Sequence, residues 1–112
     1  MKITDVSTLP VSPNPHHVNV RKAYESPHAV AVVITLKPGE ALKMHITPVD
    51  VFFYVLEGIG CVVIGDERTT LERTCWSRAK AWIPHRWINE STGLFRVLVV
   101  KVPGPAEETK LL

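Results

Sequence analysis

Hydrophobic and polar residues alternate along this chain in short runs, and no stretch keeps the spacing of an amphipathic helix. Turn-forming segments such as Pro38-Gly39, Gly65-Asp66 and Ser91-Thr92-Gly93 separate the runs. Short runs rich in Val, Ile and Thr favour β-strands. The pattern predicts about nine strands, at residues 18–21, 29–36, 41–46, 51–56, 60–64, 68–71, 79–83, 86–89 and 94–102.

The regular recurrence of turn signals between short strands predicts an all-β antiparallel sandwich or barrel. A chain of 112 residues has room for a single core. We expect residues 18–103 to form the barrel. Residues 1–17, which include the proline-rich stretch 7–15, are expected to be an extended N-terminal arm. Residues 104–112 are expected to be a polar C-terminal tail that frays.

Composition narrows the class of protein. Apolar residues make up 46% and charged residues 21%, which excludes a disordered chain, and no apolar run is long enough to span a membrane. The net charge of +2 is small and scattered, so nucleic acid is not an expected partner. Asp5 stands where a signal peptide would be apolar, and Cys61 and Cys75 form no disulfide framework. These features indicate a cytoplasmic protein.

The segment of residues 38–58 resembles the first motif of the cupin superfamily in the spacing of its Gly and His residues. That motif runs Gly, five residues, His, one residue, His, three or four residues, Glu, six residues, Gly; Gly39, His45 and Gly58 match it without a gap. The segment His85-Arg86-Trp87-Ile88-Asn89 is similar to the family's second motif, which has a His and, after three residues, an Asn. The resemblance covers roughly residues 29–103 and implies a small antiparallel jelly-roll β-barrel.

The metal site that this resemblance implies is incomplete. In cupins, the two His and the Glu of the first motif and the His of the second typically hold one divalent metal. Carried over by position, His45 and His85 occupy two of these places, Thr47 replaces the second His, and Val51 replaces the Glu. A hydroxyl is a poor neutral ligand and an alkyl group is none. Two histidines alone would hold Fe, Mn, Ni or Zn weakly.

Asp50 precedes the missing Glu by one position. In regular pleating its side chain faces away from the cavity, and a bulge at Pro48-Val49 would turn it inward as a third metal ligand. His45 and His85 themselves allow three interpretations: metal ligands, a polar pair on the floor of a ligand cavity, or structural histidines bonded to backbone. Each interpretation requires the two rings to lie close together inside the barrel.

Further residues are candidates for a ligand cavity. Trp87 shares a strand face with His85, so it either lines the cavity and stacks on a ligand or belongs to the core. Lys43 shares a face with His45 and would recognise a carboxylate, unless it is an ordinary solvated charge. His16 and His17 lie among prolines, which predicts an exposed pair; donation to a metal from a swapped arm is the alternative.

Two functions follow from different classes. The first is a barrel that binds a small organic molecule through His45, His85, Trp87, Thr47 and Lys43, with a degenerate metal site. The second is a metal-dependent enzyme of dioxygenase, isomerase or decarboxylase type, with a divalent metal at His45 and His85 and with Asp50 or Thr47 completing the shell. The sequence does not decide whether the chain is an enzyme.

The hydropathy pattern also predicts self-association. The mean hydropathy of +0.10 is high for so small a chain, and residues 29–36 are apolar on both faces of the expected strand. A homodimer would cover that surplus apolar surface. We expect the proline-rich arm to cross to the neighbouring subunit.

Overall fold

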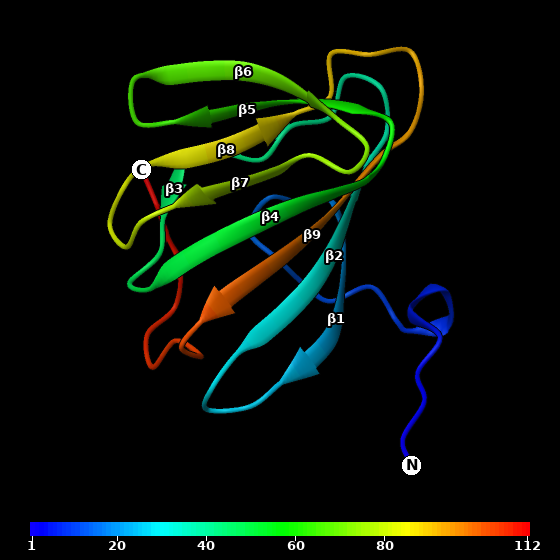
Figure 1. Ribbon diagram of the computed structural model, residues 1–112, viewed down its shortest axis with the longest axis vertical. Helices are drawn as coiled ribbons and strands as arrows, with labels where there is room; N and C mark the ends of the chain where they lie inside the picture. The colour runs from blue at the N-terminus through cyan, green and yellow to red at the C-terminus, as the bar shows by residue number, and fades with distance from the viewer.

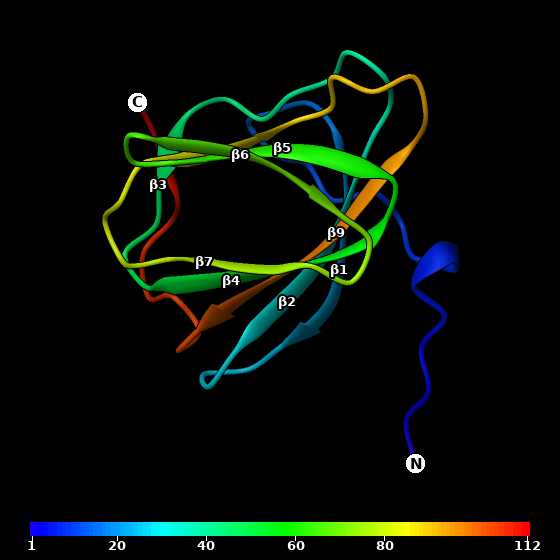
Figure 2. The same cartoon turned by 45° about the horizontal axis from the view of Figure 1, so that its top comes forward.

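Two five-stranded antiparallel sheets face each other in the computed structural model, which describes residues 1–112 (Figures 1 and 2). The first sheet has the order β1 (Asn19–Glu25), β2 (Val30–Leu36), β9 (Phe95–Val102), β4 (Asp50–Glu57) and β7 (Trp76–Ala79). The second has the order β10 (Lys110–Leu111), β3 (His45–Ile46), β8 (His85–Ile88), β5 (Ile59–Ile64) and β6 (Glu67–Glu72). The all-β jelly-roll prediction is confirmed, with ten strands.

The prediction of a strand at 79–83 is wrong. Strand β7 ends at Ala79, and the following residues form a turn that is fixed by contacts with the start of β4. The backbone N–H of Ala81 donates to the carboxylate of Asp50 at 2.8 Å, and the N–H of Trp82 donates to the carbonyl of Thr47 at 2.8 Å. Trp82 has a φ of 68°, a conformation outside any strand.

The C-terminal segment differs from the expectation. Strand β10 in the C-terminal segment pairs with β3, opposing Leu111 to His45, so this part is not a frayed tail. The pairing covers what would otherwise be an open sheet edge beside β3. The N-terminal segment contacts its own barrel in part: the N–H of Ser12 donates to the carbonyl of Val20 at 2.7 Å, and the N–H of Lys43 donates to Nδ1 of His16 at 2.9 Å. Its single short 3₁₀ turn, η1 (Val6–Thr8), is the one helix, so no helix is available to span a membrane.

The inward-facing side chains of both sheets form one hydrophobic core. In β9, Phe95, Val97 and Val99 are buried and alternate with more accessible residues, as the period of two requires. Trp87 lies at the centre, with ring centroids 5.0 Å from Phe95 and 5.6 Å from Phe53. The core cluster consists of Val18, Ile34, Leu36, Leu42, Val51, Phe53, Val55, Val62, Ala79, Trp87, Phe95, Val97 and Val99.

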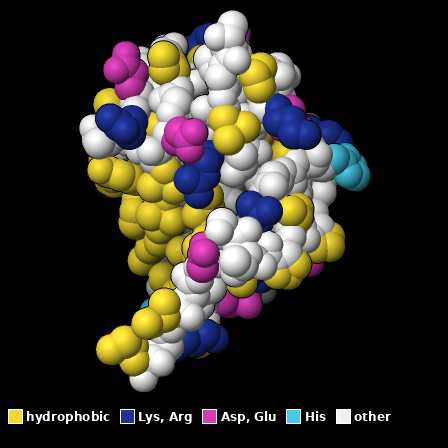
Figure 3. All heavy atoms as spheres, turned by 90° about the vertical axis from the view of Figure 1, so that its right-hand side faces the viewer, with side chains coloured by type: hydrophobic (Ala, Val, Ile, Leu, Met, Phe, Trp, Pro, Cys, Tyr) yellow, Lys and Arg dark blue, Asp and Glu magenta, His cyan; other side chains and the backbone are white.

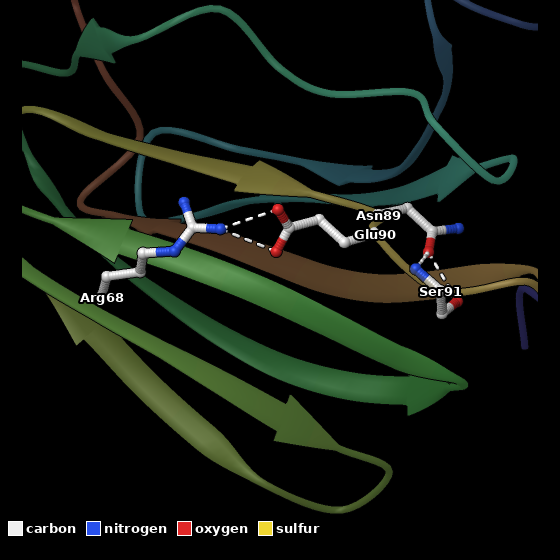
Figure 4. Close-up of polar contacts among 4 residues, drawn as sticks. All are labelled: Arg68, Asn89, Glu90 and Ser91. Atoms are coloured by element: carbon white, nitrogen blue, oxygen red, sulfur yellow. Dashed lines mark hydrogen bonds and ion pairs between the residues drawn. The ribbon is translucent and has the colours of Figure 1, made fainter.

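Asn89 fastens the turn between β8 and β9. Its side-chain amide donates to the carbonyls of Leu36 and Gly93, both at 2.9 Å, and its side-chain oxygen accepts from the N–H and hydroxyl of Ser91. Figure 4 shows Asn89 facing Ser91, with an exposed ion pair between Glu90 and Arg68 next to it. The Asn of the second motif is therefore a structural residue in this chain, because its buried side chain joins the end of β2 to the turn between β8 and β9.

The outer face of the first sheet carries a row of apolar and aromatic side chains, with Arg21, Arg78 and Arg96 elsewhere on the same face. Along one row Val33, Leu98, Tyr54 and Trp76 are register partners on four neighbouring strands. Tyr54 is 37% exposed and Trp76 is 57% exposed. Hydrophobic side chains gather along the flank of the molecule that carries this face (Figure 3). This surface is independent of the barrel interior.

Candidate functional site

His45 and His85 oppose each other on neighbouring strands. They are register partners of β3 and β8, and their ring centroids lie 4.3 Å apart with an interplanar angle of 66°. Directly opposed residues of an antiparallel pair project from the same face of the sheet, here toward the interior. His45 is 6% exposed and His85 is 2% exposed. The sequence-based expectation that the two rings meet inside the barrel is met by this geometry.

Backbone contacts set the protonation of both rings. The Nδ1–H of His45 donates to the carbonyl of Lys43 at 2.7 Å, and the Nδ1–H of His85 donates to the carbonyl of Ile83 at 2.9 Å. A carbonyl only accepts, so Nδ1 carries the proton in each neutral ring. Nε2 is then left with a free lone pair. Both histidines therefore offer an acceptor nitrogen to whatever occupies the space beside them.

A third histidine, His16, joins this pair from the N-terminal segment. Its ring centroid lies 4.7 Å from that of His45 in an edge-on arrangement. Its Nδ1 accepts a hydrogen bond of 2.9 Å from the backbone N–H of Lys43. The proton of the neutral ring therefore sits on Nε2, which acts as a donor. The expectation of an exposed pair holds only for His17, while His16 contributes to the interior.

Burial keeps these histidines uncharged at neutral pH. Desolvation, reinforced by the neighbouring His85, lowers the pKa of His45 to about 3. Desolvation, with added repulsion from Lys43 and His85, lowers the pKa of His16 to about 4. Desolvation also lowers the pKa of His85, against the opposing effect of its hydrogen bond to Ile83. The cluster consists of neutral rings that act as hydrogen-bonding groups.

The histidines line a cavity of about 140 Å³ inside the barrel. Its walls are mostly apolar side chains of β1, β2, β4 and β9, and residues 14–16 and Thr109 border it from the two ends of the chain. Lys101, at the end of β9, is the only Lys or Arg in the lining, and no Asp or Glu is present there. Desolvation, together with repulsion from Lys22, lowers the pKa of Lys101.

The two replaced motif positions lie in the cavity wall. Thr47 and Val51 are each 1% exposed, and both line the cavity. The hydroxyl of Thr47 donates to the carbonyl of Val49 at 3.1 Å. Val51 contributes an apolar surface. The positions that would carry a second imidazole and a carboxylate thus carry a hydroxyl bonded to backbone and an isopropyl group.

Three other sequence candidates lie outside the cavity lining. Asp50 is exposed and accepts from the N–H of Ala81, so its carboxylate is not turned inward. Lys43 has an exposed side chain, and it is its backbone that holds His16 and His45. Trp87 is fully buried in the core. Of the two interpretations given for each residue, the core position fits Trp87 and the solvated charge fits Lys43.

Sequence reasoning missed Lys101 and favoured an exposed position for His16. Lys101 continues the inward alternation of Phe95, Val97 and Val99 along β9, so the period of two was a usable signal for it. His16 has no periodic context among prolines. Its position depends on a hydrogen bond to a residue 27 positions away, which no local pattern predicts.

Comparison with known proteins agrees with this geometry. The family model described as Cupin domain matches residues 32–101. The chain belongs to the cupin family. No curated protein matches it in sequence.

Solved structures extend the likeness to nearly the whole cupin chain. TT1209 from Thermus thermophilus is 32% identical over 94% of this chain and 100% of its own, with a TM-score of 0.80. An uncharacterized conserved protein with a double-stranded beta-helix domain from Klebsiella pneumoniae is 23% identical over 99% and 96% of the two chains, with a TM-score of 0.83. The polyketide cyclase RemF from Streptomyces resistomycificus is 17% identical over 100% and 85%, with a TM-score of 0.84. The latter two share the fold.

The donor set of this cupin does not fit a tightly held divalent metal. No group of three His, Cys, Asp or Glu side chains is arranged to hold one. His45 and His85 offer two Nε2 lone pairs, but His16 carries its proton on Nε2 because the N–H of Lys43 occupies Nδ1. The ammonium of Lys101 adds like charge to the lining. Two neutral ligands beside a cation are a weak site for a dication.

Proposed function

We propose that this cupin binds a small organic molecule in the barrel cavity, through His45 and His85, without a firmly held metal. The observation that carries the proposal is the pair of opposed rings, each with Nδ1 bonded to backbone and Nε2 free, in the wall of an apolar cavity. Pockets of this composition, mostly apolar with a few fixed polar groups, are typical of small-molecule sites.

The size and walls of the cavity favour a compact ligand. A volume of about 140 Å³ is close to that of a protein cavity that accepts benzene. Thr47 and Val51 narrow the space and add no ionisable group. Of the ligand-binding residues expected from the sequence, the proposed site keeps His45, His85 and Thr47. Trp87 packs in the core behind Phe53 of the cavity wall, and the backbone of Lys43 orients the rings of His16 and His45.

A metal-dependent enzyme is the second candidate function. It is favoured by the closeness of His45 and His85, whose ring centroids are 4.3 Å apart with both Nε2 atoms free. Water and substrate would have to complete the coordination of Fe, Mn, Ni or Zn, because Asp50 is committed to Ala81.

One experiment separates the two candidates. Protein purified without a His tag is analysed for Fe, Mn, Ni and Zn, before and after incubation with each metal, and is then screened by NMR with benzene-sized fragments. We expect much less than one metal per chain and fragment-induced shifts of the His45 and His85 ring signals. His45→Ala should abolish those shifts, and the exposed His28→Ala should leave them intact. One equivalent of metal that disappears in His45→Ala would establish the metal-dependent candidate instead.

We further propose that the protein is a homodimer that pairs through the outer face of the first sheet. Tyr54 and Trp76 expose large aromatic areas on that face. Leu98 lies beside Tyr54 in the same row, which ends at Arg21 on β1. Contiguous exposed apolar surface of this kind is characteristic of subunit contacts. The pairing proposed here does not involve the arm, whose His16 accepts a hydrogen bond from Lys43 of its own barrel.

A further inference from the structure

Lys101 is a partly buried cation without an acidic partner. Its ammonium donates to the hydroxyl of Thr109 at 3.1 Å. The three ion pairs of the structure join other residues, and the cavity lining holds no carboxylate. A cation in low-dielectric surroundings is costly unless an anion accompanies it. An anionic group that enters this cavity therefore meets a cation whose charge nothing else neutralises.

The register of the first sheet places this cation beside the replaced carboxylate. Lys101 and Val51 are direct partners of β9 and β4, so their side chains share the interior face. Val51 stands where the resembling motif has Glu. A Glu at that position would neutralise Lys101. With Val there, the charge of the cavity is positive, the opposite of what a cation site requires.

The remaining polar atoms define what else a ligand must offer. His45 and His85 present Nε2 acceptors, which require a hydroxyl or N–H donor on the ligand. His16 presents an Nε2–H donor, which adds to Lys101 as a partner for a negatively charged oxygen. The cavity thus combines acceptors from one sheet with donors from the arm and the other sheet.

We infer that the ligand of this cavity is a short hydroxycarboxylate, whose carboxylate pairs with Lys101 and whose hydroxyl donates to His45 or His85. This inference rests on the proposed function and specifies its substrate class. The volume of about 140 Å³ limits the ligand to about the size of benzene, or roughly six heavy atoms. The hydrogen bonds from Nδ1 to backbone carbonyls support it, because they leave Nε2 of His45 and His85 as acceptors.

Three matched probes test the inference on the full-length protein. Lactate carries both groups, lactamide lacks the charge, and propionate lacks the hydroxyl. Dissociation constants are measured by NMR titration of the histidine ring protons at pH 7 and low salt. We expect lactate to bind at least tenfold more tightly than either analogue, since lactamide loses the charge attraction to Lys101 and propionate leaves the Nε2 acceptors without a donor.

A variant and its matched control test whether Lys101 is the cation that binds the carboxylate of lactate. Lys101→Met keeps an unbranched side chain that is one atom shorter and uncharged, and it should weaken lactate binding at least tenfold while leaving lactamide unchanged. Lys80→Met removes an equal charge from an exposed loop and should bind lactate like the wild type. Circular dichroism and a thermal melt verify that each variant folds. If Lys101→Met does not fold, the comparison of lactate with lactamide on the wild type decides alone.

Each outcome has a separate meaning. Equal binding of lactate and lactamide, or lactate binding that survives Lys101→Met, overturns the hydroxycarboxylate inference and leaves small-molecule binding standing. Equal binding of lactate and propionate removes the role given to the histidine acceptors and also overturns it. Failure of these probes and of benzene-sized neutral fragments to shift any of the three histidines contradicts the inference and the proposed function together.

Discussion

Acidification from pH 7 to pH 5 should destabilise this protein by a predictable amount. In the unfolded chain His45 has an ordinary pKa near 6.5, whereas burial in the folded barrel lowers its pKa to about 3. Between these two values the unfolded state binds the extra proton, so the free energy of unfolding falls as the pH falls. The stabilising contribution is fully present above pH 6.5 and is lost progressively below it.

The magnitude at pH 5 depends little on the folded value. At pH 5 an unfolded histidine is almost completely protonated and the folded His45 is almost completely neutral. Linkage then gives a loss of about 2 kcal/mol between pH 7 and pH 5 for this residue alone. His16 and His85 have lowered pKa values as well and act in the same direction. A loss clearly above 2 kcal/mol is expected for the whole cluster.

Urea unfolding of metal-free protein at the two pH values measures this loss. His45→Phe removes one titrating ring and should reduce the difference between pH 7 and pH 5 by about 2 kcal/mol. The exposed His28→Phe is the matched control and should leave most of the difference in place. The reasoning is refuted if the wild type is equally stable at both values, or if His45→Phe shows the full wild-type loss, because the histidines would then not be buried as neutral rings.

Three further predictions concern the frame and the surface. Asn89→Ala should cost about 2–4 kcal/mol in urea unfolding, because it leaves buried backbone groups unpaired, whereas the partly exposed partner variant Ser91→Ala should cost clearly less. Gly58→Ala places a Cβ 2.1 Å from a backbone oxygen and should prevent normal folding, while Gly39→Ala, with a similar positive φ but open space, should cost about 1 kcal/mol; equal melting temperatures would contradict this. Light scattering should give a dimer for the wild type and a 12.5 kDa monomer for Trp76→Glu, and a monomeric wild type would remove the dimer proposal.

The strands were predictable where alternation is strong and bounded by turn residues. Residues 29–36, 51–56 and 94–102 were found within one residue at either end. The error at 79–83 arose because Ala79, Trp82 and Ile83 look like strand residues, although backbone hydrogen bonds to Thr47 and Asp50 hold this segment as a turn. Strand β10 was missed since a two-residue pairing carries no pattern of its own.

The candidate site was predictable only in part, because its residues come from distant segments. His45 and His85 followed from motif spacing, and their register pairing explains why they meet. Lys43 was chosen by its strand face, but the strand expected at 41–46 is shortened to His45–Ile46, so that face is not maintained and the side chain is exposed. His16 reaches the site through a single backbone N–H, a contact that exists only once both segments are folded.

The replaced motif positions and Lys101 together determine the charge of the cavity, which is unfavourable for a metal cation. A site for a dication needs negative charge near the metal, and the partner of Lys101 in the register, Val51, supplies none. Restoring a carboxylate there would pair it with Lys101 before any metal arrived, because opposite charges on directly opposed residues attract at close range. With Val51 at this position and Lys101 opposite to it, the lining carries a cation and no carboxylate. In the proposed complex, the two remaining histidines, which are neutral and fixed by backbone bonds, serve as acceptors beside an anion.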